Sequence, residues 1–496
     1  MANLCSLPNE LLLLIFGYLS DDRRSLSQLC KVSRRIQAPA AEELYKDIKV
    51  DGYSHSRFSC WTRTLLECPE LANLVVNLTF HIDCQSGDRY APIDWIGQAI
   101  IEVVKMGVPA QVVGHVASNL MKGKETGFGA ILFALLPSLQ TLNIEVVDTY
   151  HEGYVEYELM KVLYGISSTD YREPGMHILR STLNNIRTLV IPIPHYELLR
   201  FFLLPQLKAL HLNLIDNYDT NYPSSHNAAT VSEVVSRTGI RELTLDSDWS
   251  EIQIANTNTW TECIFNALQK AGELELARPS IDKFVFRLSD GVSYDGSSAM
   301  SFNKLVSSMG AQLARIEHLR VELQRPSPIR HKLRRLFMSI GVIMDLSCCL
   351  RLRKLEVLQG SLVSNSFRKA PHPQVDFGRL LPTSLEALTL ICPNGKVLPW
   401  LRQLLASITV VPNLRRIELH CFRGQGRSAA WFTKDRGRVF EDFRERGVAV
   451  TITDCDQVLS PEKSRRYPDW GEGIFAGKFY VYYGENTGFD GLYGQK

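Results

Sequence analysis

The sequence lacks several features that would assign it to a large functional class. Its formal net charge is only +2 at pH 7, which gives no whole-chain argument for binding nucleic acid or a membrane. The N-terminus has no basic segment before its apolar run, so we expect no secretory signal. A second apolar stretch, Phe337 to Leu350, contains Asp345 and is too short to span a bilayer. Apolar content of 45% and charged content of 22% are typical of soluble globular proteins.

Cysteine spacing also excludes two kinds of site. The 11 cysteines are an odd number and include no Cys-x-x-Cys pair, and Cys348-Cys349 is the only doublet. This scatter argues against a disulfide framework and against a zinc finger. It favours reduced thiols, so we expect a cytoplasmic or nuclear protein.

Catalytic motifs are missing as well. The chain has no Gly-x-Ser-x-Gly, no P-loop and no histidine pair with metal-ligand spacing beside a glutamate. Gly424, Gly426 and Gly437 do not complete a dinucleotide fingerprint. Aspartates that follow the predicted strands are interpreted as a solvated acidic rim. The sequence therefore predicts a protein without enzymatic activity, cofactor or metal.

The first fifty residues predict three short helices. Pro8 is placed to start the first helix, with Glu10 in its first turn. Asp21 and Asp22 are positioned to cap the second helix. We expect Arg34 and Arg35 at the C-terminal end of that second helix and a third helix after Pro39, which presents Leu44, Tyr45 and Ile48.

The spacing of these N-terminal residues resembles an F-box, in the form common in fungal F-box proteins. The residues that carry the resemblance are Leu7-Pro8, Glu10-Leu11-Leu12, Ile15-Phe16, Tyr18-Leu19, Leu26, Leu29-Cys30-Lys31-Val32, Arg34-Arg35 and Leu44-Tyr45-x-x-Ile48. Ser33 departs from the pattern, because many relatives have an aromatic residue there. The alternative interpretation is a small helical cap on a larger domain.

A second pattern recurs after Ile48: apolar, two residues, apolar, one residue, apolar. The ten triplets are Val75-Leu78-Phe80, Leu139-Leu142-Ile144, Ile186-Leu189-Ile191, Leu207-Leu210-Leu212, Ile240-Leu243-Leu245, Ile281-Phe284-Phe286, Ile316-Leu319-Val321, Leu352-Leu355-Val357, Leu385-Leu388-Leu390 and Leu414-Ile417-Leu419. The last two residues of each triplet would point inward from a short strand, and stacked units would form a parallel sheet. This pattern resembles the irregular leucine-rich repeats that follow many F-boxes.

The predicted fold class is therefore α/β: an N-terminal three-helix F-box followed by an irregular solenoid with parallel strands on the concave side and helices on the convex side. We expect an F-box at 1–50, the solenoid at 51–455 and a Gly/aromatic tail or cap at 456–496. Helices are predicted at Trp95–Lys105, Gly129–Leu136, Val231–Arg237, Trp260–Leu274, Phe302–Leu313, Ile329–Asp345, Trp400–Ile408 and Trp431–Arg446, with a last strand at Val448–Thr453. Long loops are predicted at Asp216–Ala229, Ser289–Ser301 and Gln359–Pro373. An ordinary open α/β domain is the alternative.

The resemblance implies a function. An F-box would bind the Skp1 adaptor, and through it a cullin, while the repeats would bind an unknown protein substrate for ubiquitination. By resemblance, the residues that contact Skp1, or form the core behind that contact, are Leu7, Pro8, Leu11, Ile15, Leu19, Leu26, Leu29 and Val32. The alternative is a non-enzymatic scaffold that binds Skp1 outside the cullin ligase.

Strand alternation selects the residues that would face a substrate on the concave side. The predicted substrate-binding residues are His211, Glu242, Thr244, Arg287, Arg320, Lys354, Glu356, Arg416 and Glu418. Because Arg287, Arg320 and Lys354 accumulate in the later strands, one hypothesis is that they hold an acidic or phosphorylated segment. The alternative is a plain solvated face. Basic residues also gather at Arg325–Arg335, Arg351–Lys354 and Arg423–Arg446. Nucleic-acid binding would need exposed aromatics and a recognisable docking element beside them. Because Trp431, Phe432 and Phe440 are interpreted as core residues of the last helix, we do not expect a nucleic-acid partner.

Overall fold

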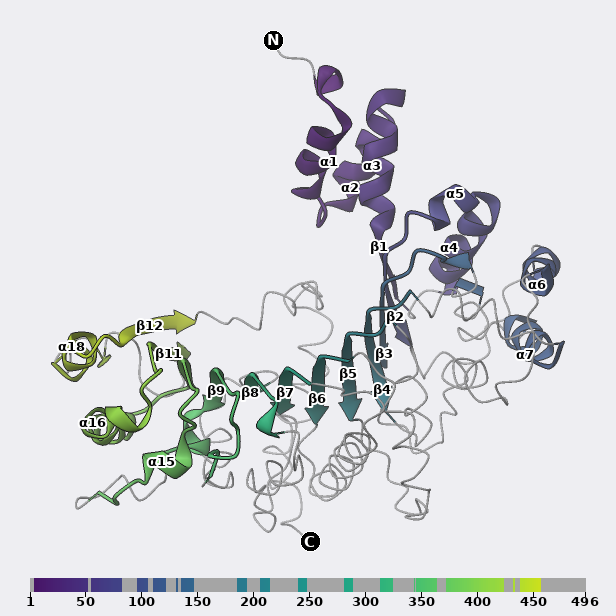
Figure 1. The fold of residues 1–496 in the computed structure, drawn as a ribbon. Coiled ribbons are helices and arrows are strands. Elements are labelled where there is room, and N and C mark those ends of the chain that lie inside the picture. The colour runs from purple at the N-terminus through teal and green to yellow at the C-terminus, as the bar shows by residue number, and fades with distance from the viewer. Residues whose placement is uncertain are drawn as a thin grey trace, which may run out of the picture.

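A small helical domain leads directly into a long curved sheet (Figure 1). The computed structural model describes residues 4–51, 55–82, 96–105, 110–121, 131–132, 135–146, 185–193, 206–214, 240–247, 281–288, 313–323, 343, 345–363, 372–422, 431–432 and 438–455.

The N-terminal domain consists of a 3₁₀ turn and three helices packed around one small core. Its elements are the turn at Leu4–Ser6, α1 (Asn9–Gly17), α2 (Arg23–Leu29) and α3 (Arg34–Lys46). Its core residues are Leu12, Phe16, Leu26, Ile36 and Ala40. The cap predicted at Asp22 is confirmed, because its carboxylate accepts the amide N–H of Ser25 at 3.0 Å. Hydrogen bonds from the Ser25 hydroxyl and from the Ser25 amide hold the pKa of Asp22 below its usual value.

Two helix boundaries predicted from the sequence are wrong. Arg34 and Arg35 begin α3 rather than ending the second helix, because the Ser33 hydroxyl accepts the amide N–H of Ile36 and caps α3 at that point. Helix α3 therefore starts before Pro39 and contains it. Ile48 lies in a strand and not in the third helix.

All the described strands form one parallel sheet of 12 strands in sequence order. They are β1 (Asp47–Asp51), β2 (Asn77–Ile82), β3 (Thr141–Val146), β4 (Thr188–Ile193), β5 (Ala209–Leu214), β6 (Glu242–Ser247), β7 (Lys283–Leu288), β8 (His318–Leu323), β9 (Lys354–Leu358), β10 (Ala387–Ile391), β11 (Arg416–Phe422) and β12 (Ala449–Cys455). Neighbours in sequence are neighbours in the sheet, so the domain is an α/β solenoid-like repeat, as predicted.

The register confirms the triplet pattern. The middle residues of successive triplets are direct partners: Leu243 pairs with Phe284, Phe284 with Leu319, and Leu319 with Leu355. Every residue of the ten triplets is at most 4% exposed. The alternating apolar residues of each strand therefore fill a core that runs along the whole sheet.

The sheet extends beyond the ten triplets at both ends. At one end β1 pairs with β2 through Ile48 and Leu78, so the sheet begins within the segment predicted as the F-box. At the other end β12 pairs with β11, which confirms the predicted last strand. Helix α3 ends at Lys46 and β1 starts at Asp47, so the helical domain adjoins the N-terminal end of the first strand (Figure 1).

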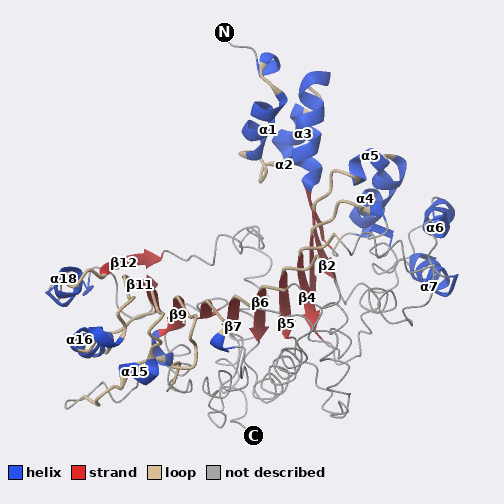
Figure 2. Ribbon diagram, in the orientation of Figure 1, coloured by secondary structure: helices blue, strands red, loops and turns tan. Residues whose placement is uncertain are grey.

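The described helices of the solenoid lie on its outer side (Figure 2). They are α4 (His55–Glu67), α5 (Pro69–Ala72), α6 (Ile96–Lys105), α7 (Ala110–Met121), α15 (Phe377–Leu380), α16 (Val397–Ala406) and α18 (Arg438–Glu445), with short 3₁₀ turns at Gln359–Ser361 and Ile408–Val410. Helices α6, α16 and α18 correspond to predicted helices, whereas α4, α5, α7 and α15 were missed. On α16, Trp400 packs edge-to-face on Phe377 of α15 with ring centroids 5.1 Å apart.

Several sequence predictions lie wholly or mostly outside the described residues. They are the helices at 231–237, 260–274, 302–313 and 329–345, the loops at 216–229 and 289–301, and the tail at 456–496. Of the third predicted loop, Gln359–Ser361 forms a buried turn. The Gln359 side chain donates a hydrogen bond to Asn394 Oδ1 at 3.1 Å, which ties this turn to the next repeat.

Candidate functional site

An apolar stripe is exposed along α1 and its C-terminal cap residue, Tyr18. Leu11, Leu14, Ile15 and Tyr18 occur at helical spacing and are 46%, 60%, 38% and 85% exposed. On the opposite side of the same helix, Leu12 and Phe16 are buried in the domain core. The helix is therefore apolar on two sides, and the domain covers only one of them. An exposed apolar surface of this kind is typical of a protein-binding site.

The residues predicted to contact Skp1 divide into two groups in the structure. Leu11, Ile15 and Val32 have exposed apolar side chains, and Pro8, directly before α1, is also exposed. Leu26 is completely buried, and Leu7, Leu19 and Leu29 pack against the core, so these four support the surface from behind. Leu14 and Tyr18 were not predicted as contacts, although their spacing from Leu11 places them on the same stripe.

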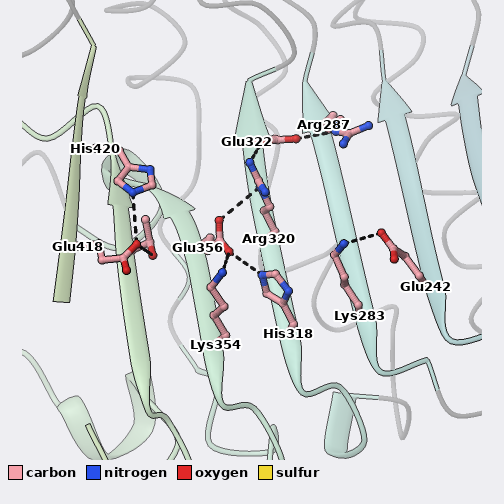
Figure 3. Close-up of polar contacts among 11 residues, drawn as sticks. Glu242, Lys283, Arg287, His318, Arg320, Glu322, Lys354, Glu356, Glu418 and His420 are labelled. Atoms are coloured by element: carbon pink, nitrogen blue, oxygen red, sulfur yellow. Dashed lines mark hydrogen bonds and ion pairs between the residues drawn. The ribbon is translucent and has the colours of Figure 1, made fainter. Parts of the chain in front are cut away.

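On the sheet, the predicted substrate-binding residues face away from the apolar core, and many of them form ion pairs (Figure 3). Lys283 Nζ lies 2.6 Å from Glu242 Oε1. Arg287 Nε lies 2.6 Å from Glu322 Oε1, and Arg287 Nη1 lies 3.8 Å from Asp246 Oδ1. These pairs join three neighbouring strands, β6, β7 and β8, because Asp246, Arg287 and Glu322 are direct partners in the register.

Glu356 is the centre of the next group of contacts. It accepts a hydrogen bond from Lys354 Nζ at 2.5 Å, is 2.8 Å from His318 Nε2, and is 3.5 Å from Arg320 Nε. Burial alone would raise the pKa of Glu356, but the hydrogen bond to His318 and the charges of Arg320 and Lys354 hold that pKa well below its usual range. Arg320 also pairs with Glu322, so this group is continuous with the pairs on β6 and β7.

Further pairs flank this network. Asp246 Oδ2 lies 2.7 Å from His211 Nε2, and both side chains are buried. On β11, Glu418 lies 3.1 Å from Arg416 and 3.3 Å from His420. We call the residues from β5 to β9 the ion-pair network: His211, Asp246, Arg287, His318, Arg320, Glu322, Lys354 and Glu356. Thr244, also predicted, is buried beside it.

The pairing limits what this network offers to a partner. Arg287, Arg320 and Lys354 each contact a carboxylate of the chain itself, and Arg287 is only 7% exposed. An acidic or phosphorylated segment would have to compete with Glu322 and Glu356 for these cations. Lys354 and Arg416, whose side chains are 40% and 51% exposed, are the predicted cations most open to solvent.

The described residues hold neither a metal-binding cluster nor a membrane-spanning helix. No group of three or more His, Cys, Asp or Glu in this part of the chain is arranged to hold a metal ion. None of the helices seen there has the length and apolar character needed to cross a membrane. Burial raises the pKa of Cys349, so this thiol is held in its protonated form.

Comparison with known protein families identifies the N-terminal domain. The F-box-like family matches residues 4–50, the segment of α1, α2, α3 and most of β1. Residues 4–50 form an F-box-like domain. Such domains are adaptor modules that bind Skp1, and they are generally non-enzymatic. A comparison with curated proteins finds no match to the chain. The exposed stripe on α1 therefore belongs to an F-box-like domain whose general partner is Skp1.

Proposed function

We propose that the chain is the substrate-recognition subunit of a ubiquitin ligase of the Skp1–cullin–F-box type. In this proposal the F-box-like domain, of the form common in fungal F-box proteins, binds Skp1 through the exposed stripe on α1. The solenoid-like domain, an irregular leucine-rich repeat, binds the protein to be ubiquitinated. The observation that carries it is the exposure of Leu11, Leu14, Ile15 and Tyr18 on a domain of the F-box-like family. Catalysis would belong to the recruited enzymes, and this chain would supply proximity and orientation.

Two features support the proposal that the two domains bind different partners. The apolar stripe lies on the domain that is too small to be robust alone, so a partner that covers it would also stabilise it. The sheet offers a long polar face whose side chains are fixed by ion pairs, which suits selective recognition better than strong binding. We expect such a complex in the cytoplasm or the nucleus.

A second candidate function is a Skp1-binding scaffold that acts without the cullin. The same apolar stripe supports it, because that surface is proposed to bind Skp1 and does not indicate whether a cullin is also bound. Co-purification separates the two functions, because only the ligase subunit brings a cullin with Skp1.

The test uses the full chain with Leu11→Ser and Ile15→Ser together. Both side chains are exposed, so the fold should persist while Skp1 co-purification falls by at least about tenfold. The matched control is Leu350→Ser, which removes an apolar side chain that is 71% exposed on the solenoid. Skp1 retained by the double variant would overturn the proposed docking surface, and Skp1 without a cullin would favour the scaffold.

A further inference from the structure

The residues directly before the strands form a continuous edge of the sheet. The amide N–H of Lys208 donates to the carbonyl of Arg187 at 2.8 Å, and the amide of Arg241 donates to the carbonyl of Lys208 at 2.8 Å. In the same way, the amide of Asp282 donates to the carbonyl of Arg241, and the amide of Glu317 donates to the carbonyl of Asp282. We call this row of residues the N-terminal rim; its members from β4 to β11 are Arg187, Lys208, Arg241, Asp282, Glu317, Arg353, Glu386 and Arg415.

Three consecutive members of the N-terminal rim are basic. Arg187, Lys208 and Arg241 precede β4, β5 and β6, and all three are exposed. Neighbouring strands lie about 4.8 Å apart, so the three residues start from backbone positions within roughly 10 Å of one another. Charges this close act together at physiological salt, where the screening length is about 8 Å.

These cations differ from those of the ion-pair network, because the described carboxylates pair with only one of the three, Arg241. Arg187 and Lys208 make no ion pair within the described part of the chain, and Arg241 approaches only Asp282, at 4.0 Å. The reason is visible in the strands beside them, since neither β4 nor β5 contains an acidic residue. Glu242 on β6 is already paired with Lys283 at 2.6 Å.

The charges at the next positions of the N-terminal rim indicate which class of macromolecule would bind there. Asp282 and Glu317 reverse the sign of the rim on β7 and β8. A nucleic-acid backbone, whose charge repeats without change of sign, would be repelled as it passed from Arg241 to Glu317. A polypeptide can follow the reversal, with acidic residues beside Arg187, Lys208 and Arg241 and a basic residue beside Glu317.

We infer that the N-terminal rim at Arg187, Lys208 and Arg241 binds an acidic segment of a protein partner. This inference rests on the proposed function in one respect, since it takes that partner to be the protein presented to the ligase. The placement fits that role. Helix α3 runs directly into the start of β1, and parallel pairing puts the starts of all strands on one edge, so the rim and the F-box-like domain share an edge of the sheet.

The experiment measures binding of a short fluorescein-labelled oligoglutamate peptide to the full chain by fluorescence anisotropy. Arg187→Glu with Lys208→Glu should weaken binding by about tenfold and reduce its dependence on salt. The control is Arg415→Glu, a single charge reversal at the equivalent exposed position before β11. Thermal unfolding of both variants should match that of the original chain, because all three side chains are exposed.

Other outcomes overturn the inference. They are an original chain that does not bind the peptide, equal weakening by Arg415→Glu, or tighter binding of a labelled oligouridylate RNA than of the peptide. Skp1 co-purification is measured on the same preparations. The rim variant should keep Skp1, whereas Leu11→Ser with Ile15→Ser should lose Skp1 and still bind the peptide. Failure of the rim inference is thereby distinguished from failure of the proposed Skp1 docking.

Discussion

Arg287 Nε lies 2.6 Å from Glu322 Oε1 across two neighbouring strands, and the two side chains are only 9% and 13% exposed (Figure 3). A pair so nearly buried differs in energy from one on the surface. Taking both charges out of water is costly, and their attraction offsets that cost only while both partners are present. The pair is therefore a weak contributor to net stability and a strong constraint on how β7 and β8 stack.

Removing one partner tests this distinction. Arg287→Ala should lower the free energy of unfolding by about 3 kcal/mol, because it leaves Glu322 and Asp246 short of a cation in a buried site. Arg353→Ala, in an exposed pair with Glu386 at 3.8 Å, should cost no more than about 1 kcal/mol. Urea unfolding of the two variants provides the comparison. Similar losses for both would show that the network is solvated in solution.

A double replacement sharpens the test. Arg287→Met with Glu322→Leu removes both charges and leaves Asp246 beside His211 and Arg320 beside Glu356. Stability should recover part of what Arg287→Ala loses, because Glu322 is no longer a buried charge without Arg287, whereas Asp246 still lacks that cation. A double variant less stable than Arg287→Ala would mean that the pair itself stabilises the fold.

The pH dependence follows from Glu356. Its pKa in the folded chain lies well below the ordinary value of 4.5, because His318, Arg320 and Lys354 favour the carboxylate. A depressed folded pKa means that the unfolded chain binds the proton more readily, so the stabilisation is fully present above about pH 4.5 and is lost as pH falls below it. Glu356→Gln should be less stable than the original chain at pH 7, and the difference should shrink below pH 4.5. A difference that stays constant between pH 7 and pH 3 would contradict this account.

The sheet could be predicted from the sequence because its signal is repeated and local. Each triplet places its last two apolar residues on one face of a strand, and no single unit can bury that face alone. Leu243, Leu319 and Leu388 were expected at equivalent positions, and the register places them there through their neighbours. The helices of the outer side repeat less regularly, which is why α4 and α7 were missed.

The ion-pair network was harder to predict, because it depends on which strands are neighbours. Once the triplets are aligned, Asp246, Arg287 and Glu322 fall at the same position of three successive strands and alternate in sign. That alternation was present in the sequence and was interpreted as a gradient of charge along the sheet. The substrate role of these residues stays a prediction. Charge reversal at Arg320 would test it poorly, since a new carboxylate beside Glu322 and Glu356 would also destabilise the fold.

The helix boundaries at the N-terminus failed for a local reason. Arg34 and Arg35 suit a helix C-terminus by charge, and Pro39 suits a helix start, but Ser33 caps α3 first. A single side-chain hydrogen bond thus outweighed two compositional signals. Ile48 was predicted in a helix because the expected third helix was extended past Lys46, into the residues that form β1.

The register itself is testable by truncation of single core residues. Leu243→Ala, Leu319→Ala and Leu388→Ala should each cost roughly 2–5 kcal/mol, because each side chain is at most 2% exposed and contacts the strands on both sides. Leu350→Ala, at an exposed turn, is the control and should change the free energy of unfolding very little. Chemical unfolding measures all four. Small losses at the three core positions would argue against the stacking described here.

The last prediction separates the core of the F-box-like domain from its docking surface. Leu26 is completely buried among Leu12, Phe16 and Ile36, whereas Leu14 is 60% exposed on the stripe of α1. Leu26→Ala should cost roughly 2–5 kcal/mol, a large share of the stability of so small a domain. Leu14→Ala should leave the domain folded and weaken Skp1 binding by about fivefold, the effect of an interface side chain worth about 1 kcal/mol.

Hydrogen exchange in the full chain distinguishes these two effects. In Leu26→Ala the amides of α1 to α3 should exchange faster, while the amides of β7 to β11 stay protected, because the core of the helical domain is separate from that of the sheet. In Leu14→Ala exchange should match the original chain in both regions. Added Skp1 should slow the exchange of α1 in the original chain and do so less in Leu14→Ala. Equal exchange rates in Leu26→Ala and the original chain would mean that Leu26 does not hold the three helices together.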